Sequence, residues 1–322
     1  MPSRLRQLWR DHPRATAALR WALGLGLLAL TLTWIDPAEV LTPIGAADPV
    51  WLALALLLSL PMMLLMAVRW SFTARRMGVE LPLRTAWRDY YVSALLNSVL
   101  PGGVAGDVVR VARQAGGPAR PLGPVARSVV VERAVGQLVL WLMLLTSAVL
   151  WGLGDVALAV SVALSIAVIG ALVLVGLGAH PRVASTAPGR LIARIRGELR
   201  AALLSGWALV VQLSTSVGSL IAFIGMYYCC TRAIGSVMTP AQALLVVPGI
   251  LAVTTVPLTV GGWGVRELSA MALFELAGIP SADGAASSVL FGAACLVAML
   301  PGVVPLLRRS TVEARLPEGD RS

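Results

Sequence analysis

The chain has 322 residues, 57% of them hydrophobic and only 13% charged, whereas soluble domains usually carry about a quarter charged residues. This composition predicts an integral membrane protein and leaves no room for a separate soluble catalytic domain. The net charge of +10 comes from a basic set made entirely of arginine. These arginines follow the positive-inside pattern of membrane topology, so we expect no nucleic-acid partner.

The first part of the sequence predicts two membrane spans behind a basic arm. Residues 1–14 are arginine-rich and are expected in the cytoplasm, because basic residues concentrate on that side. The apolar stretches 15–35 and 50–68 are each long enough to cross a membrane. The loop between them is acidic and is expected outside, whereas 71–88 is expected to form a short amphipathic helix or surface loop on the cytoplasmic side.

The segment 89–113 is apolar but cannot form one continuous helix. Its helix breakers are Pro101, Gly102, Gly103 and Gly106, and its polar residues include Asn97, Asp107 and Arg110. Arginines flank the segment on both sides, so both of its ends are expected in the cytoplasm. It therefore predicts a re-entrant hairpin, because a broken and charged stretch at membrane depth needs protein or water around it.

The rest of the chain predicts four more spans and a second broken segment. The spans are expected at 128–151, 156–178, 206–230 and 281–305, with an amphipathic interfacial helix at 188–204. Segment 241–276 again combines prolines and glycines with a charged pair, and the basic tail 308–322 is expected in the cytoplasm. For the span directions to agree, 241–276 must enter and leave from outside, opposite to the first hairpin.

We therefore expect an all-α polytopic transmembrane domain over 15–307, with about six transmembrane helices and two opposed re-entrant hairpins. Opposed broken hairpins are typical of transporters built from inverted repeats, whose discontinuous helices form a site near the membrane midplane. The sequence shows no strong residue-level repeat, so an inverted repeat is expected from topology alone. Both termini are expected in the cytoplasm, and the protein in the inner membrane of a bacterium.

The breaks and their charges predict a site for an anionic headgroup. Backbone N–H groups at the start of a half-helix suit a phosphate, although tight packing alone would also explain the glycines. Asn97 suits a helix cap better than a ligand contact. The candidate headgroup-binding residues are Asn97, Gly102, Gly103, Gly106, Asp107, Arg110, Glu132, Arg133, Gly261, Gly262, Gly264, Arg266 and Glu267.

The charged residues of this site are expected to pair across segments. Adjacent residues on a helix point about 100° apart, so the neighbouring pairs Glu132-Arg133 and Arg266-Glu267 are not both expected to be self-satisfied. We expect a cross-paired cluster around one polar cavity that leaves at least one arginine for the ligand. The alternative is structural ion pairing, as Asp107 and Arg110 share a helix face.

No metal site and no cofactor are predicted. Cys229, Cys230 and Cys295 lie in apolar stretches, and neither His12 nor His180 has the neighbours of a catalytic or metal-binding histidine. The ATP-binding pattern GxxxxGK[ST] is absent. We therefore expect any substrate movement to be downhill or coupled to an ion.

Four blocks stand in order along the chain. They are Arg69-Trp70; Asn97 with Leu100-Pro101-Gly102 and Gly106-Asp107-x-x-Arg110; Glu132-Arg133-x-x-Gly136; and Pro257 with Gly261-Gly262-x-Gly264-x-Arg266-Glu267. Together they resemble the lysylphosphatidylglycerol synthase transmembrane-region family, also called flippase-like, with Ala105 as a departure from an expected glycine. This resemblance implies a relative of proteins that move an aminoacylated phospholipid between leaflets. Those relatives carry a soluble aminoacyl-transferase domain that is not found in this sequence, so we do not expect it to make lysylphosphatidylglycerol.

These features predict a protein that binds an anionic headgroup or lipid phosphate and translocates the lipid between leaflets, rather than an enzyme. Its expected partners are membrane lipids. One alternative is an intramembrane lipid-modifying enzyme that uses a carboxylate as base. Another is a non-transporting subunit that positions a partner enzyme of lipid or cell-envelope synthesis. If the protein has a headgroup site, Arg110 and Arg266 should not tolerate neutral substitution. If it is a non-transporting subunit, both arginines should tolerate it.

Overall fold

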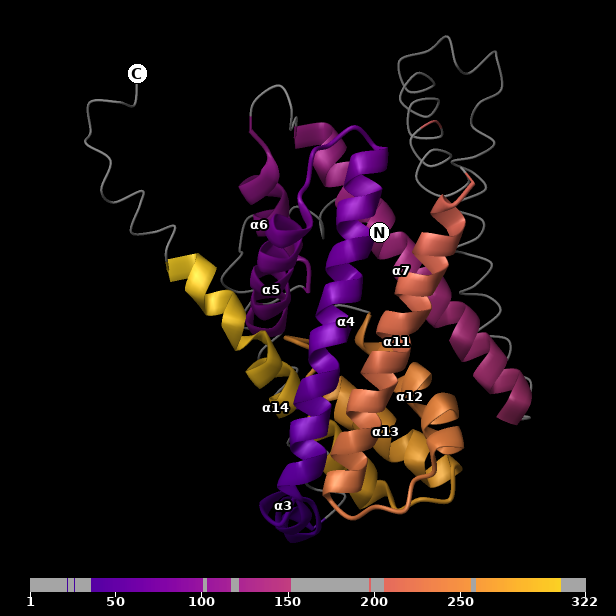
Figure 1. The fold of residues 1–322 in the computed structure, drawn as a ribbon. Helices are drawn as coiled ribbons and strands as arrows, with labels where there is room; N and C mark the ends of the chain where they lie inside the picture. The colour runs from indigo at the N-terminus through magenta and orange to yellow at the C-terminus, as the bar shows by residue number, and fades with distance from the viewer. Residues whose placement is uncertain are drawn as a thin grey trace, which may run out of the picture. The chain divides into compact units, whose positions relative to one another are not determined.

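The computed structural model describes residues 36–100, 103–116, 122–151, 206–255 and 259–307, with isolated positions at 22, 26 and 197. Within this part of the chain all regular secondary structure is helical (Figure 1). Four of the described helices are long and apolar enough to cross a membrane: Pro49–Arg76, Leu122–Leu150, Ala208–Ala233 and Ser281–Leu307. The all-α prediction is therefore confirmed for the described residues.

The chain divides into two compact units. The first consists of Met1–Leu57, Tyr91–Arg110 and Gly225–Ser322, and the second of Leu58–Tyr90 and Val111–Ile224. The boundaries fall inside helices α4 (Pro49–Arg76), α5 (Leu83–Val99), α6 (Ala105–Gln114) and α11 (Ala208–Ala233). Each unit therefore contains parts of the same helices, and each has its own buried polar contacts.

Helix α3 (Pro37–Gly45) lies where the sequence predicts only an acidic loop. Its first turn is capped, because Asp36 Oδ1 accepts a hydrogen bond from the Ala38 backbone N–H at 2.9 Å. Val40 is buried with Met271, Ala285 and Ala286, so α3 packs onto the start of α14 in the first unit. The prediction of a loop is wrong here, since one apolar face is enough to fold the segment into a helix.

Helix α4 starts beside the end of α11 and extends past the predicted span. The Asp48 N–H donates to the carbonyl of Ala233 at 2.9 Å, and Asp48 Oδ1 caps Val50 N at 2.8 Å. The helix ends at Arg76, and Gly78 in the following turn has a φ of +79°, a conformation common just past helix ends. The segment 71–88 is therefore not a separate helix: it comprises the end of α4, a turn and the start of α5.

The first predicted interruption is present between α5 and α6. The sequence places Pro101 just past α5, and a proline disfavours helix in the residue before it. The two helices are bridged by side chains near the break and again near their far ends, through Ser93 to Asp107 and Asp89 to Arg113. Such pairing across both helices makes α5 and α6 an antiparallel hairpin.

The second predicted interruption separates α12 (Pro240–Thr254) from α13 (Val265–Leu276). Gly261, Gly262 and Gly264 have φ values of +59°, +78° and +83°, which interrupt a right-handed helix and suit glycine. At the opposite end of the hairpin the Gln242 side chain donates to the Ala277 carbonyl at 3.3 Å. The chain therefore enters and leaves this hairpin at one end, and α12 packs along α13 (Figure 1).

Three further long helices complete the described fold. They are α7 (Leu122–Trp151), α11 (Ala208–Ala233) and α14 (Ser281–Met299), which continues into the 3-10 turn η2 (Leu300–Gly302). Each covers one predicted span within a few residues, apart from an N-terminal extension of α7. The predictions for 1–14, 15–35, 156–178, 188–204 and 308–322 lie outside the described residues.

Candidate functional site

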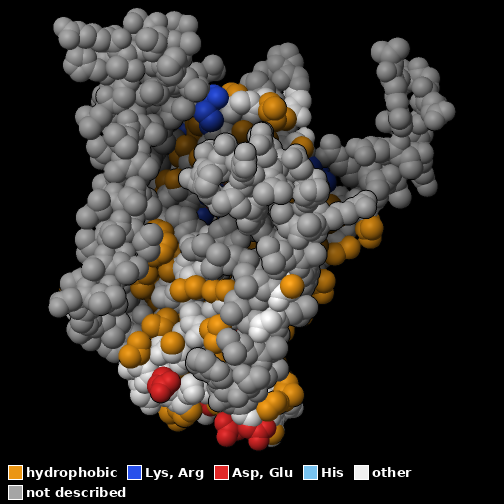
Figure 2. Space-filling view, turned by 180° about the vertical axis from the view of Figure 1, so that it is seen from behind, with side chains coloured by type: hydrophobic (Ala, Val, Ile, Leu, Met, Phe, Trp, Pro, Cys, Tyr) orange, Lys and Arg blue, Asp and Glu red, His pale blue; other side chains and the backbone are white. Residues whose placement is uncertain are grey.

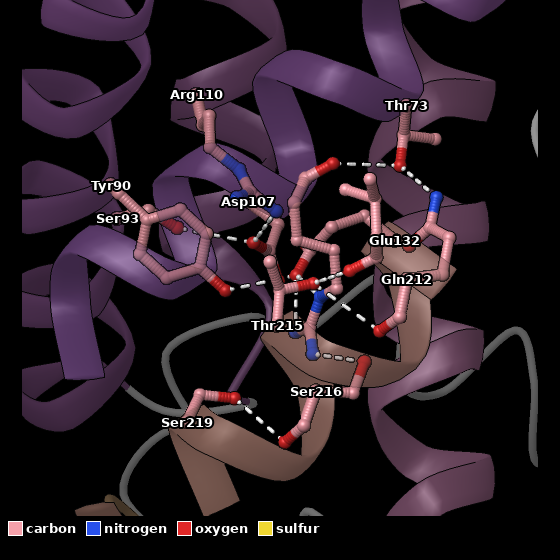
Figure 3. A network of polar contacts seen from close by, with 12 residues as sticks. Thr73, Tyr90, Ser93, Asp107, Arg110, Glu132, Gln212, Thr215, Ser216 and Ser219 are labelled. Atoms are coloured by element: carbon pink, nitrogen blue, oxygen red, sulfur yellow. Dashed lines mark hydrogen bonds and ion pairs between the residues drawn. The ribbon is translucent and has the colours of Figure 1, made fainter. Parts of the chain in front are cut away.

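The first interruption is followed by an ion pair on one face of α6. Asp107 Oδ1 accepts hydrogen bonds from Arg110 Nη2 at 2.9 Å and from Ser93 Oγ at 3.1 Å (Figure 3). The Arg110 side chain is fully buried, whereas the Asp107 side chain is 13% exposed. Asp107 is the third residue of α6, where a carboxylate also favours the positive end of the helix dipole.

Asn97 and Gly106 fasten the start of α6 to α5. Asn97 Oδ1 accepts a hydrogen bond from the Gly106 N–H at 2.8 Å, which confirms the expected capping role of this asparagine. A Cβ at Gly106 would collide with the backbone carbonyl of Ser93. This glycine is thus required by the close approach of two helices, so its predicted role as a phosphate-binding turn stays a prediction.

The second interruption is followed by a more enclosed ion pair. Arg266 Nη2 lies 2.8 Å from Glu267 Oε1, and Arg266 Nε contacts both Glu267 Oε1 at 3.2 Å and Ser288 Oγ at 3.0 Å. The second oxygen of Glu267 accepts the Gly264 N–H at 2.6 Å, which caps α13. Glu267 is 1% exposed, so its carboxylate is both buried and satisfied.

Aromatic rings and a glycine enclose the Arg266 guanidinium. Its centre lies 4.8 Å from the Trp263 ring and 5.7 Å from the Phe291 ring, distances at which cations attract aromatic faces. A Cβ at Gly292 would collide with Arg266 Nη2. Gly292 on α14 therefore provides the space in which the arginine lies, four residues after its hydrogen-bond partner Ser288.

The two interruptions meet in the first unit. A Cβ at Gly261 would lie 2.6 Å from the carbonyl oxygen of Ser98, so the glycine backbone packs against the end of α5. Ser98 Oγ also lies 3.1 Å from the sulfur of Met299 on α14. The carbonyl-rich end of one half-helix and the glycine turn of the other hairpin are thus neighbours.

Two buried polar atoms near this meeting point have no hydrogen-bond partner among the residues that the structure describes. They are Asn97 Nδ2, on the side chain whose oxygen caps α6, and Thr259 Oγ1, two residues before Gly261. Thr259 is only 4% exposed. Leaving a buried donor unsatisfied costs about 1 to 3 kcal/mol, so these groups are suited to contact a ligand.

The second unit contains a buried network around Arg69 and Glu132. Glu132 Oε1 lies 2.5 Å from Arg69 Nη2 and 3.0 Å from Arg69 Nε, and it accepts the Tyr90 hydroxyl at 3.2 Å (Figure 3). Arg69 Nη1 donates to Ser216 Oγ at 3.0 Å, which ties α4 to α11. Glu132 is fully buried, and a buried carboxylate with three such contacts is well compensated.

Gly136 makes this ion pair possible. It lies one helical turn after Glu132, and a Cβ there would come 2.9 Å from Arg69 Nη2. The spacing Glu132-x-x-x-Gly136 therefore presents a carboxylate and a space for the guanidinium on one face of α7. Beside Arg69, the Gln212 amide donates to Thr73 Oγ1 at 2.8 Å, so the polar face of α11 serves helix packing, as its small and hydroxyl residues favour.

The predicted cross-pairing of charges is wrong at Arg266, and at Glu132 the pairing crosses segments but to an arginine outside the predicted set. Arg266 pairs with its neighbour Glu267, because the glutamate turns back to cap α13 and the long arginine side chain reaches the same point. Glu132 pairs with Arg69 of α4. Asp107 and Arg110 neutralise each other on one helix face, as the alternative hypothesis states. A single cavity enclosing all three carboxylates stays a prediction.

The structure does not assign three further candidate residues to the site. Gly102 lies outside the described residues, Gly103 has a φ of +64°, and Arg133 is half-buried on α7. Arg69 is not among the predicted site residues, because it enters the prediction only as part of the Arg69-Trp70 family block. An arginine continuous with a long apolar stretch is itself a signal, because lipid does not tolerate it without a partner. The sequence offers no comparable signal for Tyr90, Ser93 or Ser288.

In the described part of the chain, no three histidine, cysteine, aspartate or glutamate side chains are grouped to hold a metal ion. Cys229, Cys230 and Cys295 are all buried and free. Their surroundings are those of packing residues in apolar helices.

Long apolar helices, two interruptions and buried ion pairs define the chain as a polytopic α-helical membrane protein. The family model described as lysylphosphatidylglycerol synthase TM region matches residues 18–302, and the chain belongs to this family. No curated protein matches the chain.

Proposed function

We propose that this protein binds the anionic headgroup of a membrane lipid where its two helix interruptions meet, and that it helps the lipid pass between leaflets. The observation that carries the proposal is the contact between Gly261 and the Ser98 carbonyl, which brings both interruptions to one place. Discontinuous helices that meet in this way form the binding sites of many transporters. Membership of the lysylphosphatidylglycerol synthase TM region family supports a lipid-related role.

Where the two interruptions meet, the polar atoms without a hydrogen-bond partner in the described part of the chain favour a ligand that has hydrogen-bond acceptor atoms. Asn97 Nδ2 is a donor with no acceptor among the described residues, and Thr259 Oγ1 can also donate. The start of α6 adds the positive end of a helix dipole beside Asn97. A lipid phosphate supplies several acceptor oxygens and a negative charge, which match these groups.

Arg110 is the arginine that we assign to the headgroup. Its partner Asp107 has a side chain that is 13% exposed, compared with 1% for Glu267 and 0% for Glu132. Because the exposed member of the pair is the carboxylate and Arg110 is fully buried, a phosphate binds Arg110 only by replacing Asp107, an exchange that the more buried Glu267 and Glu132 allow less readily. Arg266 is held by two partners and lies against aromatic rings, so in this proposal it positions α13.

The membrane arrangement is part of the same proposal. We place six spans and two opposed re-entrant hairpins in a bacterial inner membrane, with both termini in the cytoplasm. The shared ends of the α12–α13 hairpin support a re-entrant path. Acidic side chains gather at the lower edge of Figure 2, and Asp36, Glu39 and Asp48 are exposed around α3. Residues 36–49 contain no arginine, which supports an external position for this end of the first unit.

Leaflet exchange of labelled phospholipids in proteoliposomes tests the proposal. The wild-type protein is expected to speed exchange of at least one anionic headgroup over protein-free liposomes, and Arg110→Gln is expected to abolish this gain. Ser214→Ala is the matched control, because the exposed Ser214 hydroxyl bonds only a carbonyl of its own helix. Equal exchange with and without protein for every headgroup would instead favour the non-transporting subunit.

A further inference from the structure

We infer that the turn between α4 and α5 is a preformed docking surface for the anionic phospholipid headgroups of one leaflet. This inference is independent of lipid translocation, since it concerns lipids that surround the protein rather than a lipid that passes through it. The surface is defined by five exposed residues of the second unit: Arg75, Arg76, Arg84, Trp87 and Arg88.

The charge of this surface is strongly one-sided. Four arginines are exposed between residues 75 and 88, and Glu80 is the one exposed acidic residue in that stretch. The neighbouring Asp89 is fully buried and is bound by Arg113, by Gln114 and, at 3.1 Å, by Arg88 Nε, so it offsets part of the charge of Arg88 but not that of the other three arginines. A cluster of guanidinium groups suits phosphate, to which arginine can donate two parallel hydrogen bonds.

The turn beneath the arginines is firmly held. Met77, Val79 and Leu81 are buried at 8%, 2% and 1% exposure, so alternate residues of the turn anchor it to the protein. The Ser71 hydroxyl donates to the Leu81 carbonyl at 2.7 Å and closes the turn onto α4. The arginines therefore project from a rigid base, which lowers the entropy lost when they bind a headgroup.

The neighbouring side chains match the boundary between headgroups and acyl chains. Trp87 is 38% exposed and Leu83 is 40% exposed on the first turns of α5, beside Arg84 and Arg88. Tryptophan concentrates at this depth of the membrane because its ring is both apolar and a hydrogen-bond donor. Charge complementarity and an apolar rim together favour an anionic lipid leaflet over an acidic protein segment.

Spin-labelled lipids in proteoliposomes of phosphatidylcholine test this inference. The measured quantity is the fraction of label held at the protein surface, compared between phosphatidylglycerol and phosphatidylcholine labels. The wild type is expected to prefer phosphatidylglycerol, and the variant Arg75→Gln, Arg76→Gln, Arg84→Gln is expected to lower the preference by about threefold. Salt is expected to weaken the wild-type preference, because it screens exposed charges.

Glu80→Gln and Arg232→Gln are the control variants. Glu80→Gln removes the opposing charge of the surface and is expected to raise the preference for phosphatidylglycerol. Arg232 belongs to the first unit and is engaged with the Trp51 ring and the Ser236 carbonyl, so its loss should leave the preference unchanged. Equal retention of both labels by the wild type, or an unchanged preference in the triple variant, would overturn the inference.

Discussion

Gly261 packs against the carbonyl of Ser98, and a side chain at Gly261 would begin 2.6 Å from that oxygen. The contact joins the end of α5 to the glycine turn between α12 and α13, two segments far apart in the sequence. Backbone contacts this close are possible only where no Cβ is present. The close contact between the two interruptions therefore depends on the absence of a side chain at Gly261.

Replacing Gly261 with alanine is expected to separate the two interruptions. The φ of +59° alone costs an L-residue about 1 to 2 kcal/mol, and the contact with Ser98 adds a backbone collision. Gly278→Ala is the matched control, because Gly278 has a φ of +72° but open space around it. Thermal unfolding in detergent should show a larger loss for Gly261→Ala, and equal losses would contradict the close contact.

Replacing Gly136 with alanine is expected to destabilise the protein although alanine favours helices. The new methyl would lie 2.9 Å from Arg69 Nη2 and push the guanidinium away from Glu132. Gly218→Ala, also within a helix, would meet only the end of the Leu65 side chain at 3.0 Å. That control should be neutral or gain up to about 1 kcal/mol from helix propensity, so opposite signs for the two variants are the expected result.

Neutralising Glu132 is expected to leave Arg69 as a buried and poorly compensated charge. Glu132→Gln should lower the free energy of unfolding by about 3 to 5 kcal/mol. The double variant Arg69→Met, Glu132→Leu should recover much of this loss, because it removes both charges. If Glu132→Gln unfolds at the same denaturant concentration as the wild type, the 2.5 Å ion pair is not the stabilising contact that we describe.

Asp89 is expected to hold the open end of the α5–α6 hairpin. Its carboxylate accepts from Arg113 Nε at 3.0 Å, from the Gln114 side-chain amide, and from Arg88 Nε at 3.1 Å. Arg113 has a side chain that is 7% exposed, whereas that of Arg88 is 52% exposed. Arg113→Gln should therefore accelerate proteolysis near residues 113–116 at the end of α6, whereas Arg88→Gln should be cleaved like the wild type, because water screens exposed pairs.

The helix interruptions could be predicted because proline and glycine act locally. The glycines of 261–264 mark the second break, and the structure places a turn of positive φ angles there. The positions of the described spans follow from apolar length, although α4 and α7 extend past their predicted boundaries. Helix α3 was not predicted because its stability comes from packing Val40 against α13 and α14. The nine residues of the helix contain no sequence pattern that indicates this contact.

The ion pairs could not be assigned from spacing alone. Helical geometry correctly brings Asp107 and Arg110 together, since they are three residues apart. The same geometry fails at Arg266 and Glu267 because Glu267 caps the backbone of Gly264 and leaves the ordinary helical direction. The partner of Glu132 lies 63 residues away on α4, and only the packing of two helices reveals it.

The proposed site is tested most directly by comparing the wild type with the Asn97→Asp variant. The measured quantity is the rate at which an anionic phospholipid exchanges between leaflets. Aspartate keeps the oxygen that caps Gly106 but replaces the unpartnered Nδ2 donor with an acceptor. We predict that Asn97→Asp folds with a thermal stability close to that of the wild type and loses the exchange that the wild type supports. Wild-type exchange rates in a stably folded Asn97→Asp protein would contradict a headgroup site at the meeting of the two interruptions.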